Sequence, residues 1–221
     1  MTALIGDEPD PAGRRMTVLA APPATTITEL AVGFADVCGF TTLSRFVDLP
    51  HLELVVQSFE DVCAGALGDR SEIMKSVGDG MLYAMPSTDD AVAAAVRLVA
   101  AARECTLLPP LRVGLAFGSV LVRRQDCFGA VVNLASRLVA AAPPGAVLVS
   151  DAAHDEARKQ WWSWRRLPRR ELKGVGSVAA WKVTGVSTFS LGIRRSRDGE
   201  QVPRGQACPP VPEVPPVPPR S

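Results

Sequence analysis

Histidine, cysteine and net charge are all scarce in this sequence, and each shortage argues against a class of function. The 221 residues include two histidines and five cysteines, and the formal net charge is +1. Two histidines are too few for a histidine-based metal centre. The cysteines are odd in number and lack CxxC spacing, which argues against a disulfide framework or a zinc site and fits a reducing cytosol. The near-neutral charge gives no reason to expect nucleic acid as a partner.

Long apolar runs are also missing. No segment approaches the roughly 20 apolar residues that a membrane-spanning helix needs. The apolar patch Val18–Ala21 is too short for the core of a signal peptide. We therefore expect a cytoplasmic protein with no membrane contact.

Both ends of the chain differ in composition from its middle. Residues 1–28 are rich in Pro, Ala, Gly and Thr without periodicity, which predicts a flexible leader. Residues 186–221 end in ACPPVPEVPPVPPRS, which favours an extended, disordered tail. The alternative is a tail that docks on a proline-recognition domain of a partner. One folded domain is expected between them, over residues 29–185.

Apolar patterns in this domain switch between strand and helix periods, which predicts an α+β fold. The order is typical of an antiparallel sheet with helices on one face. Gly78-Asp79-Gly80 indicates a hairpin turn, and Ser87 or Thr88 can cap a helix. Strands are expected at 29–35, 71–77, 81–84, 111–116, 120–123 and 146–150, with two or three more in 164–183, and helices at 51–67, from 87 or 88 to about 102, and at 130–142.

Two aspartates stand where apolar strands give way to turn residues: Asp36 in GFADVCGFT and Asp79 in KSVGDGMLY. Taken singly, either is an ordinary cap or turn residue. A carboxylate at the end of a buried strand needs a cation or several donors. Two of them brought together by a sheet predict a place for divalent metals and a polyphosphate.

Three segments, GFADVCGFTTLSR, IMKSVGDGMLY and DCFGAVVNLASRL, together resemble the catalytic domain of class III nucleotidyl cyclases. The resemblance runs from about Glu29 to Val183. It implies a ferredoxin-like βαββαβ core with extra C-terminal strands, and the conversion of ATP to cyclic AMP. It is similar to the abbreviated actinobacterial members, because the segment between Gly118 and Asp126 is shorter than the hairpin arm of many cyclases.

The resemblance also implies roles for four polar residues. Asp36 and Asp79 match the aspartates that hold two Mg²⁺ or Mn²⁺ ions per site. Lys75 and Asp126 match the residues that select the base, where Lys with Asp reads adenine and Glu with Cys reads guanine. Adenine offers an acceptor and a donor at that edge, so its site needs one donor and one acceptor. The alternative for Lys75 is a surface ion pair with Asp79 across the hairpin.

Five more residues match family positions that contact the nucleotide. Asn133 and Arg137 lie four apart on one helix face, and in the family they orient the ribose and stabilise the pentavalent transition state. Lys173 in ELKGVG resembles a phosphate-contacting lysine. Phe40 and Thr41 follow Asp36 in the turn that lies against the triphosphate, where backbone amides can meet phosphate oxygens.

In the family, one domain supplies the metal aspartates and a second supplies the base selectors, Asn and Arg. This chain carries both sets, so the resemblance implies a homodimer with two equivalent sites. Two other hypotheses remain open at this point. One is a guanylate or dual-specificity cyclase, and the other is a cyclase-like regulatory module with weak or no turnover.

Overall fold

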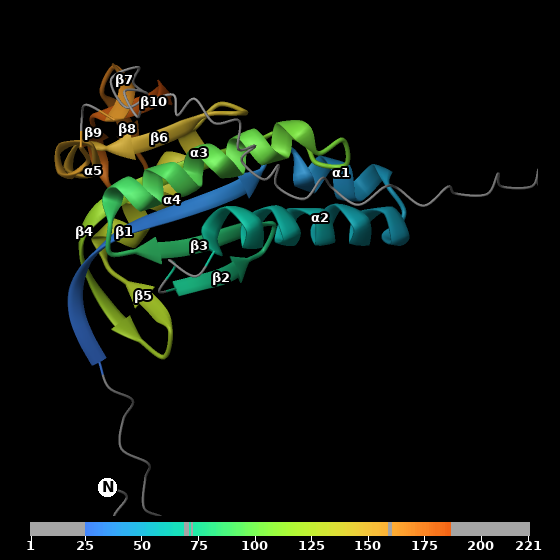
Figure 1. The fold of residues 1–221 in the computed structure, drawn as a ribbon, viewed down its shortest axis with the longest axis horizontal. Helices are drawn as coiled ribbons and strands as arrows, with labels where there is room; N and C mark the ends of the chain where they lie inside the picture. The colour runs from blue at the N-terminus through green and yellow to red at the C-terminus, as the bar shows by residue number, and fades with distance from the viewer. Residues whose placement is uncertain (1–24, 69–70, 72, 159–160, 187–221) are drawn as a thin grey trace, which may run out of the picture.

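The computed structural model describes residues 25–68, 71, 73–158 and 161–186, and the predictions for the leader up to residue 24 and for the tail from 187 lie outside them. Residues 25–28, predicted as the end of the leader, form the start of the first strand instead. An eight-stranded sheet forms its centre (Figure 1). Neighbouring strands are antiparallel except for β4 and β6, which run parallel. The predicted α+β class is confirmed. The strand order is β2 (Ile73–Val77), β3 (Gly80–Met85), β1 (Thr25–Val37), β4 (Leu111–Arg123), β6 (Val147–Ser150), β10 (Ala180–Val186) and β7 (Trp162–Arg166), with β5 (Asp126–Phe128) paired to β4.

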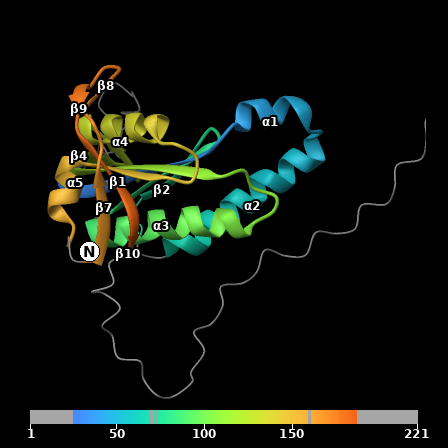
Figure 2. The same cartoon turned by 90° about the horizontal axis from the view of Figure 1, so that it is seen from above.

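Helices cover both faces of this sheet, which corrects the expectation of helices on one face. α2 (Leu49–Leu67) and α3 (Thr88–Glu104) pack on one side and α4 (Ala130–Ala141) on the other (Figure 2). The reason lies in β1, which is apolar on both faces. Ala31 and Ala35 join the cluster with α2 and α3, whereas Leu30 and Val32 join the cluster with α4. A central strand buried on both sides needs two helical layers.

The shortest helices and strands were not predicted from the apolar pattern of the sequence. Two short helices, α1 and α5, were not predicted, since about seven residues are too few to show a 3.6-residue period. The predicted strands 111–116 and 120–123 form the single strand β4, which continues through Gly118. The two small strands β8 and β9 form a hairpin apart from the main sheet. These elements are α1 (Phe40–Phe46), α5 (Asp151–Glu156), β8 (Arg170–Leu172) and β9 (Gly176–Val178).

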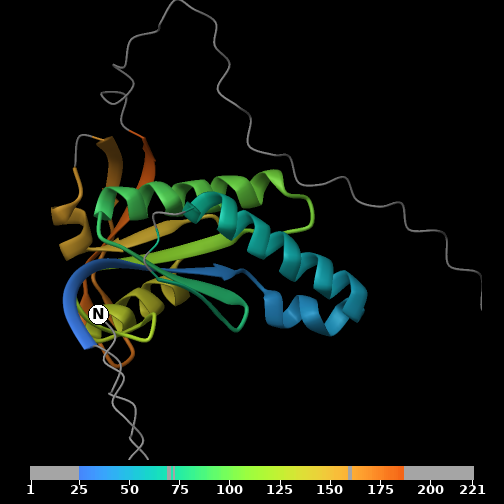
Figure 3. The ribbon, with the colours of Figure 1, turned by 60° about the horizontal axis from the view of Figure 1, so that its bottom comes forward.

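Local signals explain where the longer helices begin. The Asp48 carboxylate accepts a hydrogen bond from the His51 backbone N–H at 3.0 Å and caps α2. Of the two candidate caps for α3, Ser87 serves, because its Oγ accepts from the Asp90 N–H at 3.2 Å. Each side chain satisfies an N–H that has no partner inside the helix. Beyond the edge of the sheet, α1 and the start of α2 project together (Figure 3).

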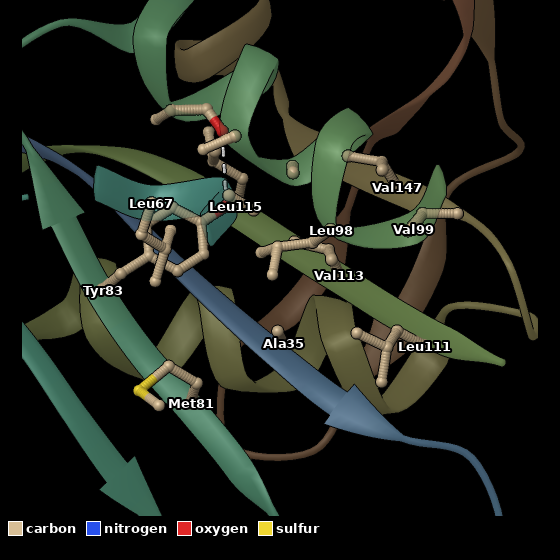
Figure 4. Close-up of a cluster of buried hydrophobic side chains, with 14 of the residues drawn as sticks. Ala35, Leu67, Met81, Tyr83, Leu98, Val99, Leu111, Val113, Leu115 and Val147 are labelled. Carbon is tan, nitrogen blue, oxygen red and sulfur yellow. Dashed lines mark hydrogen bonds between the residues drawn. The ribbon is translucent and has the colours of Figure 1, made fainter. Parts of the chain in front are cut away.

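The main core lies between the sheet and the helices α2 and α3 (Figure 4). Tyr83 is fully buried there, and its hydroxyl donates to the Ala91 carbonyl at 3.3 Å. Burial raises the pKa of this phenol far above its ordinary value. Among the described residues, no helix is long and apolar enough to cross a membrane.

α4 packs tightly against the sheet at Gly114, and this contact provides a stability test. A Cβ added at Gly114 would lie 2.2 Å from the backbone nitrogen of Val139. Gly114→Ala should therefore lower the free energy of unfolding by about 3 kcal/mol, measured by urea denaturation. The matched control is Gly65→Ala inside α2, where a Cβ meets nothing within 4 Å. That change should raise stability by about 0.5–1 kcal/mol. If the urea concentration at the unfolding midpoint is no lower for Gly114→Ala than for the wild type, the close contact is contradicted.

Candidate active site

Asp36 and Asp79 lie at the same end of the sheet. Asp36 is the penultimate residue of β1 and pairs in register with Gly80 of β3. Asp79 immediately precedes Gly80 in the predicted β2–β3 turn, where Gly78 has φ 63°. Since neighbouring strands lie about 4.8 Å apart, the hairpin brings the two carboxylates to adjoining positions. Both are only partly exposed.

Arg112 is the polar neighbour of Asp36 that the sequence reading missed. It stands opposite Asp36 in the β1–β4 register. Its Nε and Nη2 donate to Asp36 Oδ2 at 2.7 and 2.6 Å, and its Nη1 donates to the Ala140 carbonyl of α4 at 3.3 Å. A signal was present, because Arg112 interrupts the apolar run between the buried Leu111 and Val113. This end of the sheet therefore holds both charge signs, the Arg112 guanidinium paired with Asp36 and the Asp79 carboxylate next to Asp36.

The chemistry of this corner fits a hard divalent cation. Carboxylate oxygens are the ligands that Mg²⁺ and Mn²⁺ prefer. Among the described residues no group of three or more His, Cys, Asp or Glu side chains could hold a metal by itself. A cation here would therefore have two carboxylates and take its other ligands from phosphate oxygens and water, as Mg²⁺ commonly does in nucleotide sites.

Lys75 and Asp126 meet, although 51 positions separate them in sequence. Lys75 Nζ donates to Asp126 Oδ2 at 2.5 Å, so the alternative pairing of Lys75 with Asp79 is not the one formed. Asp126 Oδ1 accepts from the Cys127 N–H at 3.0 Å, which fixes the carboxylate. Cys127 is buried, and burial first, then the Asp126 charge, raises the pKa of its thiol. The pair presents one cationic donor and one anionic acceptor side by side.

The turn before Asp126 is as short as a hairpin allows. Arg124 and Gln125 both have positive φ, 52° and 58°, between β4 and β5. A two-residue turn of this type matches the twist of the strands it joins. The short segment after Gly118 is therefore a tight β4–β5 hairpin that carries Asp126 at its tip.

Asn133 and Arg137 are exposed on the same side of α4, as the four-residue spacing predicted. Arg137 Nε donates to the backbone carbonyl of Lys173 at 3.0 Å. Lys173 lies in the turn between β8 and β9, so the structure brings these two candidate residues together through the main chain of one and the side chain of the other.

Phe40 and Thr41 open α1 directly after the strand that carries Asp36. Gly39 precedes them with φ 76°, a conformation that glycine adopts without strain. Its carbonyl accepts the N–H of Thr42 at 3.0 Å and of Leu43 at 2.9 Å. The turn thus places the first backbone N–H groups of α1 near the aspartate end of the sheet.

Two of the candidate residues, Lys75 and Asp36, lie on the side of the sheet that α4 covers. Lys75 pairs with Leu82, and Leu82 pairs with Phe34, two residues before Asp36. Paired residues and residues two apart point to the same face, so Lys75 and Asp36 face the layer that holds α4. Among the described residues the candidates form three polar groups: Asp36 with Arg112 beside Asp79, Lys75 with Asp126, and Arg137 with Lys173.

Comparisons with known proteins agree with this geometry. A family model described as "Adenylate and Guanylate cyclase catalytic domain" matches residues 23–185. An adenylate cyclase of Streptomyces coelicolor is 44% identical over 129 residues, which cover 58% of this chain and 34% of that protein. A pH-sensitive adenylate cyclase of Mycobacterium tuberculosis is 30% identical over 169 residues, covering 74% of this chain and 43% of that protein.

A comparison with solved structures also finds a cyclase fold. The adenylyl cyclase CyaB from P. aeruginosa superposes with a TM-score of 0.63 at 25% identity, over 72% of this chain and 95% of that chain. The chain spans about a third of the length of the Streptomyces relative. The family match covers most of the chain, and the solved structure shares its fold. The chain therefore belongs to the adenylate and guanylate cyclase catalytic domain family, the class III nucleotidyl cyclases that its three motifs resemble.

Proposed function

We propose that this chain is an adenylate cyclase that converts ATP to 3′,5′-cyclic AMP and pyrophosphate as a homodimer. The ribose 3′ hydroxyl gives its proton to water and its oxygen bonds to the α-phosphorus, while the bond from that phosphorus to the bridging oxygen breaks and pyrophosphate leaves with the electron pair. The observation that carries the proposal is the contact of Lys75 with Asp126 on the sheet face that also holds Asp36. The names of the curated relatives support adenine nucleotides as the substrate class.

The Lys75–Asp126 pair has the polarity that adenine requires. An ammonium donates to a ring nitrogen, and a carboxylate accepts from the exocyclic amino group. Lys75 carries three donors, so its bond to Asp126 leaves donors for a base. The pair is half-exposed on the Lys75 side, where an ion pair adds little stability. Its value therefore lies in presenting a preformed donor and acceptor to the substrate.

Asp36 and Asp79 would hold the divalent cations. Both contacts of Arg112 are made to Oδ2 of Asp36, so Oδ1 is the oxygen that we assign to a metal. When bound, two divalent ions lower the cost of charge on the attacking and leaving oxygens. Arg112 adds a fixed positive charge at the same corner, suited to the oxygens of the triphosphate. The N–H groups of Phe40 and Thr41 and the Lys173 ammonium are further phosphate donors.

Asn133 and Arg137 would act on the ribose and the reacting phosphoryl group. The Asn133 amide donates and accepts, as a sugar hydroxyl requires. The planar fork of the Arg137 guanidinium matches the oxygens of a pentavalent phosphorus. Its Nε is already held by the Lys173 carbonyl, which leaves the terminal nitrogens to face the substrate.

A second copy of the chain would complete each site. Ile27, Leu121 and Phe128 form a row across β1, β4 and β5, and they are 76%, 37% and 50% exposed. This apolar row adjoins Asp126 on the β4–β5 hairpin, so covering it also closes the base-reading pair. Two-fold symmetry then sets the aspartates of one protomer against Lys75, Asp126, Asn133 and Arg137 of its partner.

The test is direct synthesis of cyclic nucleotide by the purified chain. The protein is incubated with Mn²⁺ and either ATP or GTP over a wide range of protein concentrations. Cyclic AMP should form from ATP, with specific activity that rises with concentration as dimers assemble. Cyclic GMP alone would favour the guanylate cyclase hypothesis. If neither cyclic nucleotide forms at any protein concentration, the enzyme proposal fails and the hypothesis of a cyclase-like regulatory module remains.

A further inference from the structure

The β8–β9 hairpin extends beyond the main sheet and reaches the candidate active site. Its two strands have three residues each and form no pairing with the main sheet. The hairpin continues the paired strands β7 and β10, because the Leu167 N–H donates to the Ala180 carbonyl at 2.9 Å just beyond their ladder. A two-stranded ribbon that extends beyond a sheet is marginally stable in water, so specific contacts help to fix its outer end.

One end of the hairpin holds Arg137. The Lys173 carbonyl that accepts the Arg137 Nε–H lies in a turn closed by a hydrogen bond from the Val175 N–H to the Leu172 carbonyl at 3.0 Å. Gly174 and Gly176 have φ values of 76° and 91°, so the turn uses conformations that favour glycine. The position of the carbonyl thus follows the position of the whole hairpin.

The other end is clamped by Arg169. Its Nη2 donates to the Ser177 carbonyl at 2.8 Å, and its Nε lies 3.5 Å from Ser177 Oγ. Arg169 precedes β8 and Ser177 lies in β9, so one guanidinium adds a side-chain link to the three backbone pairs that join the two strands. This fork gives a defined orientation that a single donor does not.

Apolar packing between the hairpin and α4 is incomplete, so the Arg169 hydrogen bonds help to fix the hairpin. Leu167 and Leu172 lie against Leu138 of α4, but both are only partly buried. A shallow apolar cavity remains between α4 and the hairpin, lined by Leu138, Leu172 and Val178 among others. Because apolar contacts here are incomplete, we expect the side-chain link of Arg169 to help set where the hairpin lies on α4.

We propose that Arg169 is a positioning residue for Arg137, acting through the hairpin and the Lys173 carbonyl. The proposal rests on the proposed function, in which Arg137 stabilises the transition state. A catalytic group must be held within about 0.5 Å of its productive place, and a displacement of about 1 Å costs on the order of a hundredfold in rate. Arg169 itself touches neither substrate nor reacting atoms.

The kinetic test replaces Arg169 and compares two backgrounds. Arg169→Ala should lower kcat about ten- to a hundredfold, and Arg169→Lys should restore part of it, since lysine keeps one donor. Arg137→Ala is severely impaired, and in that background the same change should lower the residual kcat, measured at high protein concentration, less than about twofold. Arg165→Ala is the matched control, an exposed arginine of the neighbouring strand β7. Equal losses in both backgrounds, or no loss in the wild-type background, would overturn the proposal.

A second readout does not depend on turnover. The Arg137 Nε–H gives an NMR signal, assigned by its loss in Arg137→Lys, and its hydrogen bond slows exchange with water. Exchange at Arg137 should quicken at least about tenfold in Arg169→Ala and stay unchanged in Arg165→Ala. If the wild-type chain makes no cyclic nucleotide, the proposed function fails while this measurement still decides the mechanical link. Unchanged exchange in Arg169→Ala would show that Arg169 does not position Arg137.

Discussion

Replacing Asp36 with alanine should lower cyclic AMP formation by at least about a thousandfold, which corresponds to about 4 kcal/mol of transition-state stabilisation. The carboxylate is one of two that adjoin at the end of β1 and the β2–β3 turn, and among the described residues no group of three or more His, Cys, Asp or Glu could hold a metal. Losing it removes a ligand and leaves the Arg112 charge without its partner. The measurement is kcat with Mn²⁺ and ATP, together with the metal concentration that gives half-maximal rate.

Two further variants separate the metal role from stability. Asp36→Asn keeps the shape and an oxygen that can accept from Arg112, but it removes the charge that a metal needs. It should be as inactive as Asp36→Ala while its melting temperature stays near that of the wild type. Asp61→Ala, on the exposed side of α2, is the matched control and should retain full activity. An active Asp36→Asn enzyme would remove this carboxylate from the mechanism.

Exchanging both base selectors should reverse the choice of nucleotide. In Lys75→Glu/Asp126→Cys the cationic donor becomes an acceptor, and the carboxylate becomes a thiol, the pattern that reads guanine in the family. The ratio of kcat/KM for ATP to that for GTP should fall at least about a hundredfold, because a site built for one hydrogen-bond pattern leaves buried groups unpaired with the other.

The single substitutions make this prediction stricter. Lys75→Glu alone sets a second carboxylate where Lys75 Nζ lies 2.5 Å from Asp126, so like charges repel. That variant should be poor with both nucleotides, and Asp126→Cys should relieve the repulsion in the double variant. A double variant that keeps the wild-type ratio would show that the pair does not read the base.

The motifs predicted the neighbours within the candidate site better than apolar periodicity predicted how the helices are layered on the sheet. Asp36 and Asp79 were predicted to meet because each ends a strand, and the β1–β3 register brings them together. The contact of Lys75 with Asp126 was implied only by the resemblance, since nothing local joins positions 51 apart. The prediction that the helices lie on one face of the sheet was wrong for α4. The apolar pattern of a helix shows which of its own faces is buried, but not which face of the sheet it packs on.

Long-range partners were the other gap in the sequence reading. Arg112 was missed because its carboxylate partner lies 76 positions away, on the neighbouring strand. The β8–β9 hairpin was read as part of a stretch of two or three strands, and three-residue strands carry almost no alternation to count. Its bond to Arg137 runs through a backbone carbonyl, which every residue has, so no side-chain pattern could indicate it.

Mixing two inactive variants tests the central claim, that one chain holds half of each site. Asp36→Ala and Arg137→Ala are combined in equal amounts, and mass spectrometry of differently tagged chains establishes that mixed dimers form. About half of the dimers are then mixed, and one of the two sites in each is intact, so about a quarter of wild-type activity should return.

Asp36→Ala mixed with Asp79→Ala is the control, and it should stay inactive because both aspartates serve the same site. Recovery in the first mixture but not in the second is the result that a site shared between two chains predicts. An inactive first mixture, with mixed dimers present, would contradict it.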